Sequence, residues 1–263
     1  VSAVAHGLLA SGIGAGERVA VYLPKQPETV FGLFGAAAAG ACFVPVNPLL
    51  KSRQLAHILP HCNVRILITS KARLDTLVDI LPGSEWPRRY AARLGTLVLV
   101  AFDGTRPGKL PEDELLFVDQ MLSRYGMAAT ATIVFSHLPM WPMARGREHE
   151  ILDDPDLLSL LHRNGVDLYA SGHHHAFFAG IDEAGMVHVG VGALGGNARA
   201  FAGGGQRQPH SFAVLSLDRG EVSVTARAAP GFDSEVSTAQ LPASISGPLG
   251  LLRRIDHPVR LRP

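Results

Sequence analysis

The sequence predicts an α/β protein in which helices alternate with buried strands. Apolar segments rich in Val, Ile and Ala recur along the chain, and most of them lead into a helical pattern. Hydrophobic residues make up 47% of the 263 residues and aromatic residues only 6%, while 28 Gly and 18 Pro provide many turns. Strands and helices that alternate at this spacing are typical of parallel βαβ units. A chain of this length is expected to form one or two domains.

Residues 1–85 are expected to form a partial parallel βα layer. The predicted strands are 19–23, 41–44 and 64–69. The predicted helices lie before Gly12, from Pro27 to Ala39, over about 52–59 and over about 71–80. Pro27 suits the first turn of its helix, because the missing N–H has no intrahelical partner there. Pro24 ends the first predicted strand, and Gly12 and Gly40 end the first two predicted helices.

A segment rich in chain breakers, Leu81–Pro87, predicts a junction over residues 86–93. Beyond it the pattern predicts strands at 95–102, 131–135 and 166–170, and helices at about 111–126 and 154–161. Two hairpins are expected within residues 176–190 and 211–227. The Pro-, Ser- and Gly-rich residues 229–263 predict a mobile tail.

Charge and hydropathy exclude several classes of function. The formal net charge is +1, which gives no electrostatic case for nucleic acid or an anionic membrane. The longest apolar run, Val30–Val46, is interrupted by small residues and Pro45 and falls short of a bilayer span. The two cysteines, Cys42 and Cys62, are expected to be small hydrophobic residues in a reducing compartment. We therefore expect a cytoplasmic protein, with no signal segment preceding the first helix.

Histidines gather at the ends of two predicted strands. His137 follows the strand 131–135, and Gly172-His173-His174-His175 follows the strand 166–170. In an extended segment, His173 and His175 face one way and His174 the other. Metal-binding sites are often formed by histidines that lie at the ends of neighbouring strands and face one cleft. The alternative is a set of loop histidines that bind no metal.

Three features point to a known family: the strand-end His137, the Gly-His-x-His run at 172–175 and the glycine-rich run after Val187. Over roughly residues 94–228 the chain resembles the calcineurin-like metallophosphoesterases. This resemblance implies the back half of a four-layer α/β sandwich. It implies His137, His173 and His175 as ligands of a divalent metal (Mn, Fe or Zn) and hydrolysis of phosphomonoesters or diesters. It also implies a phosphate contact by Arg145 or Arg147; the alternative is that both are solvated loop arginines.

The chain departs from that family upstream of His137. The family's Asp-x-His, its Gly-Asp with a bridging carboxylate and its Gly-Asn-His are missing there. Two cations about 3.5–4 Å apart need bridging anions, which neutral imidazoles do not supply. We therefore expect at most one weakly bound ion and weak or no hydrolysis, unless a partner chain supplies further donors.

The front of the chain resembles a different family. Gly14–Leu23 and the run Ala36–Pro48, with its Val-Pro-Val-Asn-Pro, are similar to the start of the AMP-binding, adenylate-forming acyl-CoA synthetases. That family binds ATP phosphates on a later Ser/Thr/Gly-rich loop ending in Lys, and the chain leaves the pattern before it. The nearest candidate, Gly104–Leu110, has the wrong glycine spacing and ends in Leu rather than Ser or Thr.

A composite chain is the resulting prediction: an AMP-binding segment at 1–85, a junction at 86–93, a phosphoesterase-like half at 94–228 and a tail at 229–263. Three hypotheses follow, namely an incomplete metal-dependent phosphoesterase, a fragment of an adenylate-forming ligase, and a non-catalytic remnant. The partner expected is a phosphorylated small molecule. Each half would lack a part that covers its sheet, so oligomers or aggregates through exposed edges are expected.

Overall fold

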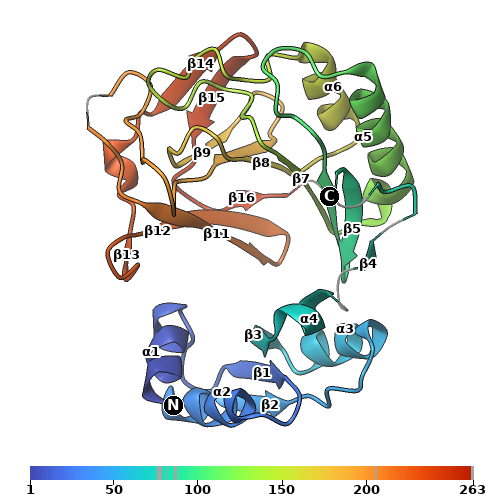
Figure 1. Cartoon of the computed structure of the whole chain (residues 1–263), viewed down its shortest axis with the longest axis vertical. Coiled ribbons are helices and arrows are strands. Elements are labelled where there is room, and N and C mark those ends of the chain that lie inside the picture. The colour runs from blue at the N-terminus through green and yellow to red at the C-terminus, as the bar shows by residue number, and fades with distance from the viewer. Residues whose placement is uncertain (76–78, 81, 86–87, 205, 262–263) are drawn as a thin grey trace. The chain divides into compact units, whose positions relative to one another are not determined.

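In the computed structural model the chain divides into two units, Val1–Asp79 and Ile80–Pro263. The structure describes residues 1–75, 79–80, 82–85, 88–204 and 206–261. The predicted α/β class is confirmed, because both units combine helices with parallel or mixed sheets (Figure 1). Residues 81, 86 and 87 of the predicted breaker segment and junction lie outside the described residues.

The first unit contains a three-stranded parallel sheet. Its elements are α1 (Ser2–Ala10), β1 (Arg18–Tyr22), α2 (Pro27–Ala38), β2 (Cys42–Pro45), α3 (Ser52–His61), β3 (Val64–Thr69) and α4 (Lys71–Asp75). Strand β1 lies between β2 and β3 and pairs with both in parallel. The expected βα layer is therefore present. The helix predicted over 71–80 is wrong at its end, because Asp79–Ile80 is the short strand β4; residues 76–78 are outside the described part.

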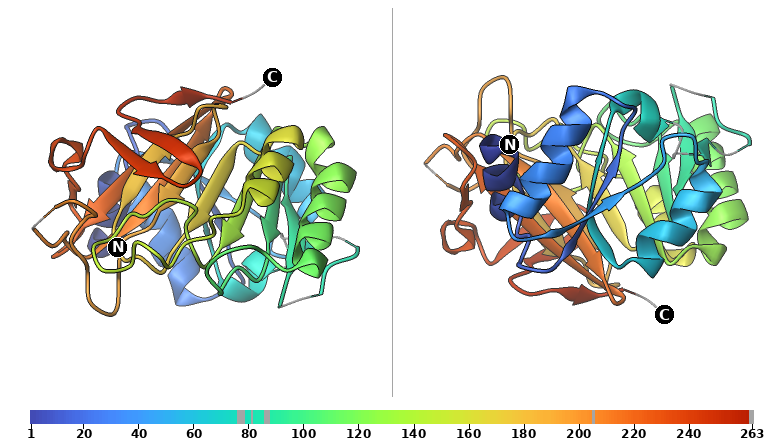
Figure 2. Two further views of the ribbon diagram at one scale, coloured as in Figure 1. Left: turned by 90° about the horizontal axis from the view of Figure 1, so that it is seen from above. Right: turned by 90° about the horizontal axis from the view of Figure 1, so that it is seen from below.

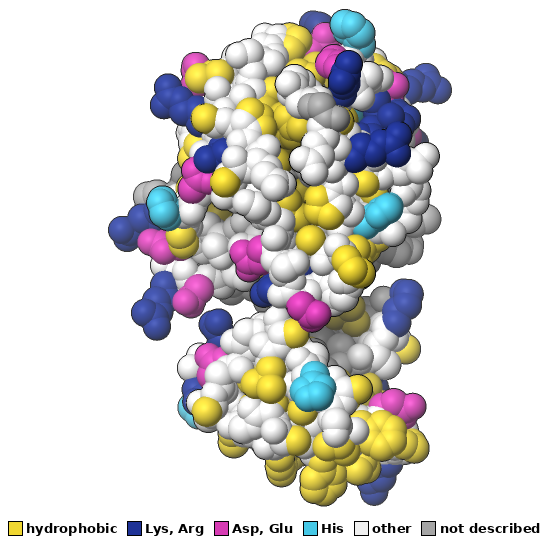
Figure 3. Space-filling model, turned by 90° about the vertical axis from the view of Figure 1, so that its left-hand side faces the viewer, with side chains coloured by type: hydrophobic (Ala, Val, Ile, Leu, Met, Phe, Trp, Pro, Cys, Tyr) yellow, Lys and Arg dark blue, Asp and Glu magenta, His cyan; other side chains and the backbone are white. Residues whose placement is uncertain are grey.

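Large apolar side chains lie on the surface of this first unit. Phe34 is 59% exposed, Phe31 46% and Phe43 42%, so the exposed set spans helix α2 and strand β2. The space-filling view shows apolar side chains gathered on this unit (Figure 3). Strands β2 and β3 are the two edges of the three-stranded sheet. Association between copies of the chain stays a prediction.

The second unit is built on a nine-stranded mixed sheet of order β14-β15-β9-β10-β8-β7-β6-β5-β4. The further members of this sheet are β5 (Tyr90–Leu94), β6 (Leu97–Ala101), β7 (Ala131–Ser136), β8 (Leu168–Ser171), β9 (Phe178–Ile181), β10 (Val187–Gly190), β14 (Ser244–Gly247) and β15 (Gly250–Arg254). Strands β6, β7 and β8 are parallel neighbours. Strand β5 overlaps the predicted junction at residues 90–93, so these residues belong to the nine-stranded sheet.

Helices and a second sheet cover the two faces of the nine-stranded sheet. The helices are α5 (Glu112–Tyr125) and α6 (Pro155–Arg163), and the smaller sheet contains β11 (Ser211–Asp218), β12 (Glu221–Ala228), β13 (Ser234–Glu235) and β16 (Val259–Arg260). Figures 1 and 2 show α5 and α6 on one side of the sheet and β11 and β12 on the other. Side chains of all three layers share one apolar core. Every helix in the described part is too short or too polar to cross a bilayer.

The prediction of a mobile tail at 229–263 is wrong for its described residues. Strands β14 and β15 form an antiparallel hairpin, and β15 extends the nine-stranded sheet by pairing with β9. Leu241, Ile245 and Leu252 are at most 6% exposed and belong to the main core. Burial of these apolar side chains outweighs the entropy cost of ordering a Pro-, Ser- and Gly-rich segment.

The connection between β7 and α6 has buried segments at both of its ends. Leu138, Met140, Trp141, Met143 and Leu152 are each at most 1% exposed. Helix α6 then begins at Pro155, after Asp154 accepts hydrogen bonds from the N–H groups of Asp156 (3.0 Å) and Leu157 (3.3 Å). Its buried side chains and this cap hold the connection between two elements, which fixes the positions of the polar side chains that it carries.

A buried carboxylate joins α6 to the turn between β9 and β10. Asp182 Oδ2 accepts hydrogen bonds from His162 Nε2 (2.7 Å) and His188 Nε2 (3.0 Å), and its Oδ1 accepts from the N–H of Met186 (2.9 Å). Burial alone would raise the pKa of Asp182, but the hydrogen bonds from His188 and His162 outweigh it and hold the pKa well below its ordinary value. The ring of His188 packs edge-on against Trp141, with centroids 4.5 Å apart.

Candidate functional site

Two neighbouring parallel strands deliver the predicted histidines to the same edge of the sheet. In the pairing of β7 with β8, Ser136 lies opposite Ser171, so His137 and the Gly172–His175 run leave the sheet side by side. His137 Nε2 lies 2.9 Å from His173 Nδ1, and the ring centroids are 4.7 Å apart. The structure thus brings together two of the three side chains predicted to bind metal. Burial lowers the pKa of His137, and nearby positive charge, first that of His173, lowers it further.

The histidine run is not extended, although its side chains do point in different directions. His173 has φ 58° and His175 has φ 52°, which is the left-handed region. Such a conformation costs a non-glycine residue about 1–3 kcal/mol, and residues of this kind cluster at functional sites. Between the two, His174 is fully buried. Two strained residues in one short run therefore mark this strand end as a candidate site.

His174 holds the run against the loop that follows β7. Its Nδ1 accepts from the backbone N–H groups of Met143 (3.1 Å) and Ala144 (3.2 Å), and its Nε2–H donates to the carbonyl of Glu150 (3.0 Å). Burial lowers the pKa of His174 to about 4, so the ring is neutral at pH 7. These contacts fix its tautomer, and they anchor the backbone of Glu150 beside His173.

Glu150 and Arg147 complete the cluster, which we call the strand-end cluster: His137, Arg147, Glu150 and His173. The Glu150 carboxylate contacts both the Arg147 guanidinium and Nε2 of His173. Arg147 Nη1 also lies 2.6 Å from that nitrogen. The hydrogen bond from His173 lowers the pKa of Glu150, and the charge of Arg147 acts in the same direction. Sequence reasoning missed Glu150, because its position in the loop follows no recognised ligand spacing.

The other predicted site residues lie apart from this cluster. His175 Nδ1 is hydrogen-bonded to the carbonyl of Asn197 (3.1 Å), and its ring lies against Gly196. Arg145 is exposed, and its backbone N–H donates to the carbonyl of Ala200 (3.0 Å). Arg147 faces Glu150 and His173 and so has its charge largely neutralised. A phosphate contact by either arginine stays a prediction.

The cluster does not fit the two-metal centre that the sequence resemblance implies. Within the described residues, no group of three His, Cys, Asp or Glu side chains is arranged to hold a metal ion. The reason lies in His173, whose Nδ1 faces His137 while its Nε2 faces Glu150 and Arg147. One imidazole cannot offer both nitrogens to the same ion. Metal binding by His137, His173 and His175 stays a prediction.

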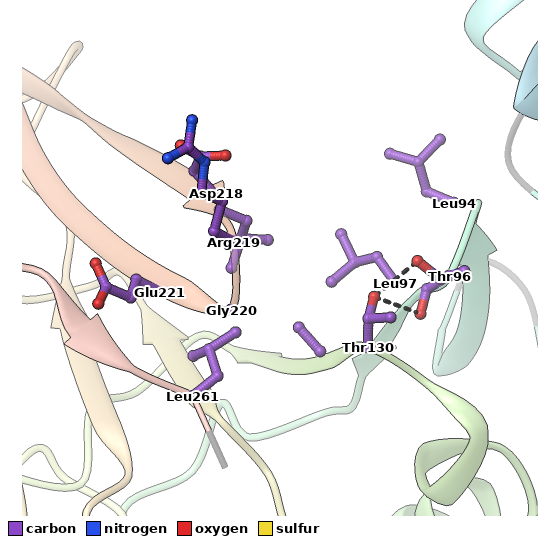
Figure 4. A pocket seen from close by; sticks show the side chains of 11 residues that line it. Leu94, Thr96, Leu97, Thr130, Asp218, Arg219, Gly220, Glu221 and Leu261 are labelled. Carbon is purple, nitrogen blue, oxygen red and sulfur yellow. Dashed lines mark hydrogen bonds and ion pairs between the residues drawn. The ribbon is translucent and has the colours of Figure 1, made fainter. Parts of the chain in front are cut away.

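A surface cleft of about 310 Å³ lies at the opposite end of the strands (Figure 4). It is lined at the starts of β6 and β7 by Leu97 and Ala131, and by the β11–β12 turn at Asp218–Glu221. The Oγ1 atoms of Thr96 and Thr130 are 2.7 Å apart on its wall. No predicted site residue lines this cleft, and it contains no histidine, so the strand-end cluster remains the candidate site.

Comparison with known proteins gives matches of two kinds. Residues 1–90 match the family model of AMP-binding enzymes. The crotonobetaine/carnitine–CoA ligase of Salmonella paratyphi A is 36% identical over 84 residues, which is 32% of this chain and 16% of the ligase. A probable non-canonical nonribosomal peptide synthetase, CymA of Salinispora arenicola, is 37% identical over 79 residues, 30% of this chain and 1% of CymA. The chain therefore spans only a small part of these curated relatives.

Solved structures of phosphatases are also similar to this chain. The purple acid phosphatase PPD1 of yellow lupin has a TM-score of 0.49 and 14% identity, covering 86% of this chain and 47% of its own. A dimetal phosphatase from Danio rerio has a TM-score of 0.39 and 16% identity, covering 76% of this chain and 73% of its own. Both TM-scores lie below 0.5.

Proposed function

We propose that residues 80–263 form a phosphoesterase-like unit with an incomplete metal site, which hydrolyses phosphate esters weakly or not at all. The observation that carries this proposal is the use of both ring nitrogens of His173 within the protein. In a complete site, metal ions would generate hydroxide and stabilise charge on the phosphoryl group. In this chain the Glu150 carboxylate contacts His173, and Arg147 neutralises its charge. These contacts support a residual site for at most one weakly bound cation.

Metal stoichiometry tests the proposal directly. Elemental analysis of untagged protein soaked in Mn²⁺ or Zn²⁺ should give one ion per chain or fewer. Hydrolysis of bis(4-nitrophenyl) phosphate should be slow or absent, and His173→Ala should change it little. His257→Ala, which alters an exposed histidine of the same unit, is the matched control. Two ions per chain, together with hydrolysis that His173→Ala abolishes and His257→Ala preserves, would overturn the proposal.

The family match of residues 1–90 favours a second candidate, a fragment of an adenylate-forming ligase. The nearest candidate for a phosphate loop, Gly104–Leu110, lies among acidic groups. The N–H of Leu110 donates to the Asp154 carboxylate (2.8 Å), and Lys109 Nζ lies 3.4 Å from Asp156 Oδ2. A phosphate group at this segment would meet carboxylates and displace hydrogen bonds that already exist. This arrangement counts against ATP binding there.

We expect Mg²⁺-ATP to leave the unfolding temperature of the chain unchanged. A ligand that binds only the folded state raises stability by RT ln(1 + [L]/Kd), which is about 2.7 kcal/mol at a hundred times Kd. Differential scanning fluorimetry over a range of Mg²⁺-ATP concentrations, with Mg²⁺-GTP as the control, measures this effect. A rise in unfolding temperature with ATP but not with GTP would favour the ligase fragment. A chain that responds neither to metal nor to ATP would be a non-catalytic remnant.

A further inference from the structure

The guanidinium of Arg147 lies at the point where Glu150 and His173 meet. Its Nη1 is 2.6 Å from His173 Nε2 and contacts the Glu150 carboxylate, which itself contacts the same nitrogen. The Arg147 side chain is only 24% exposed, and its Nε is buried without a hydrogen-bond partner. A cationic group is thus held, partly out of water, between an imidazole nitrogen and a carboxylate.

An imidazole nitrogen and a carboxylate oxygen are also the donors that bind zinc in many proteins. A metal-bound histidine usually has its second nitrogen hydrogen-bonded to another group, which fixes the orientation of the ring. His137 provides that contact here, 2.9 Å from His173 Nδ1. His173 and Glu150 therefore form a supported pair of donors, and Arg147, whose positive charge is fixed, contacts both of them.

We propose that Arg147 acts as a built-in substitute for a cation and excludes divalent ions from the strand-end cluster. Replacing Arg147 with an uncharged residue opens a zinc-binding site formed by Nε2 of His173, the Glu150 carboxylate and water. This inference rests on the proposed function, since it explains why the wild-type site binds metal weakly. The charge argument is simple: a divalent ion close to a guanidinium is repelled, whereas the carboxylate alone attracts it.

A role of Arg147 as a phosphate contact would require its guanidinium to be available to an anion. The Glu150 carboxylate already forms an ion pair with this guanidinium, and His173 Nε2 contacts its Nη1. Arg145, two residues earlier, is exposed and makes its contact with Ala200 through the backbone. It therefore provides a matched control, because its replacement removes one positive charge from the same loop and leaves the strand-end cluster intact.

The test is the zinc affinity of the full chain, measured by competition with a chromogenic chelator. Arg147→Met is expected to bind one Zn²⁺ at least about tenfold more tightly than the wild type, because a repelling charge a few ångströms away is gone. Arg145→Met should match the wild type, and Arg147→Met combined with Glu150→Gln should lose the gain. Addition of Co²⁺ to Arg147→Met should produce visible absorption from the coordinated ion, which the wild type lacks.

Two further variants keep the result decisive. Arg147→Gln removes the charge but retains a donor for Glu150, so it should tighten zinc binding even if Arg147→Met folds poorly. Arg147→Lys keeps the charge and should bind zinc as weakly as the wild type. Equal zinc affinity in Arg147→Gln and Arg145→Met, or tightening by Arg147→Lys as well, would overturn the inference. Failure of the proposed function would look different, since the wild type itself would bind two ions and hydrolyse the diester.

Discussion

Replacing Trp141 by Ala is expected to lower the free energy of unfolding of the second unit by about 3–5 kcal/mol, the range seen when a large aromatic core residue is truncated. Trp141 is fully buried. Its Nε1–H donates to the carbonyl of Gly250 (3.1 Å), and its ring lies edge-on to that of His188. It therefore joins the connection after β7 to the β14–β15 hairpin.

Urea unfolding followed by far-UV circular dichroism measures this effect. Trp141→Phe retains most of the apolar volume and should cost less than Trp141→Ala, since it gives up the hydrogen bond to Gly250 and a smaller part of the packing. Met127→Ala is the matched control for an exposed apolar side chain, because Met127 is 90% exposed, and it should change stability by less than about 0.5 kcal/mol. A Trp141→Ala protein as stable as Met127→Ala would contradict the buried path described for this loop.

The α/β class and most elements could be predicted because their signals are local. The strands β1, β3, β6 and β7 are short apolar runs, and both α2 and α6 begin at a proline. Parallel order then follows from the alternation of strands and helices. The same local signals place His137 and His173 at strand ends, and the parallel pairing of β7 with β8 explains why their rings meet.

Contacts between distant segments could not be predicted in the same way. The hairpin β14–β15 has a weak pattern, Ser244-Ile-Ser-Gly, and is ordered because Ile245 and Leu252 reach a core made by residues far earlier in the chain. The β5–β6 hairpin did offer a local signal that was overlooked, since Leu94 pairs with Leu97 across the two-residue turn Gly95-Thr96. That turn is typical of a β-hairpin rather than a linker.

The candidate site shows the same limit. The alternation of an extended run would place His173 and His175 on one side, but both residues have a left-handed backbone, and His175 Nδ1 is hydrogen-bonded to the carbonyl of Asn197. Glu150 reaches His173 because His174 binds the Glu150 carbonyl, and that contact depends on how a long loop folds over the sheet. A motif gives the order of ligands along the chain, whereas the charge balance at the site depends on such loop contacts.

Replacing Asp182 by Ala is expected to destabilise the second unit by about 3–5 kcal/mol, because removing one partner of a buried polar cluster leaves the others without hydrogen bonds. The N–H of Met186 would lose its bond to Oδ1, and the ring of His188, 1% exposed, would lose its bond to Oδ2. The Nδ1 of His188 already has no hydrogen-bond partner. Glu183→Ala, which removes an exposed carboxylate from the same turn, should change stability little.

Asp182 also predicts how stability depends on pH. Its pKa is held below the ordinary 3.8 in the folded state, so the unfolded chain takes up a proton at this residue first as the pH falls. The stabilisation from Asp182 is therefore complete above pH 3.8 and is lost as the pH falls through the folded-state pKa. Asp182→Asn keeps an oxygen for the Met186 N–H but cannot ionise, so this part of the acid-induced loss should be absent. Urea unfolding at neutral pH and near pH 3 compares the two proteins; equal losses of stability would mean that the Asp182 carboxylate is not the ionised centre of this cluster.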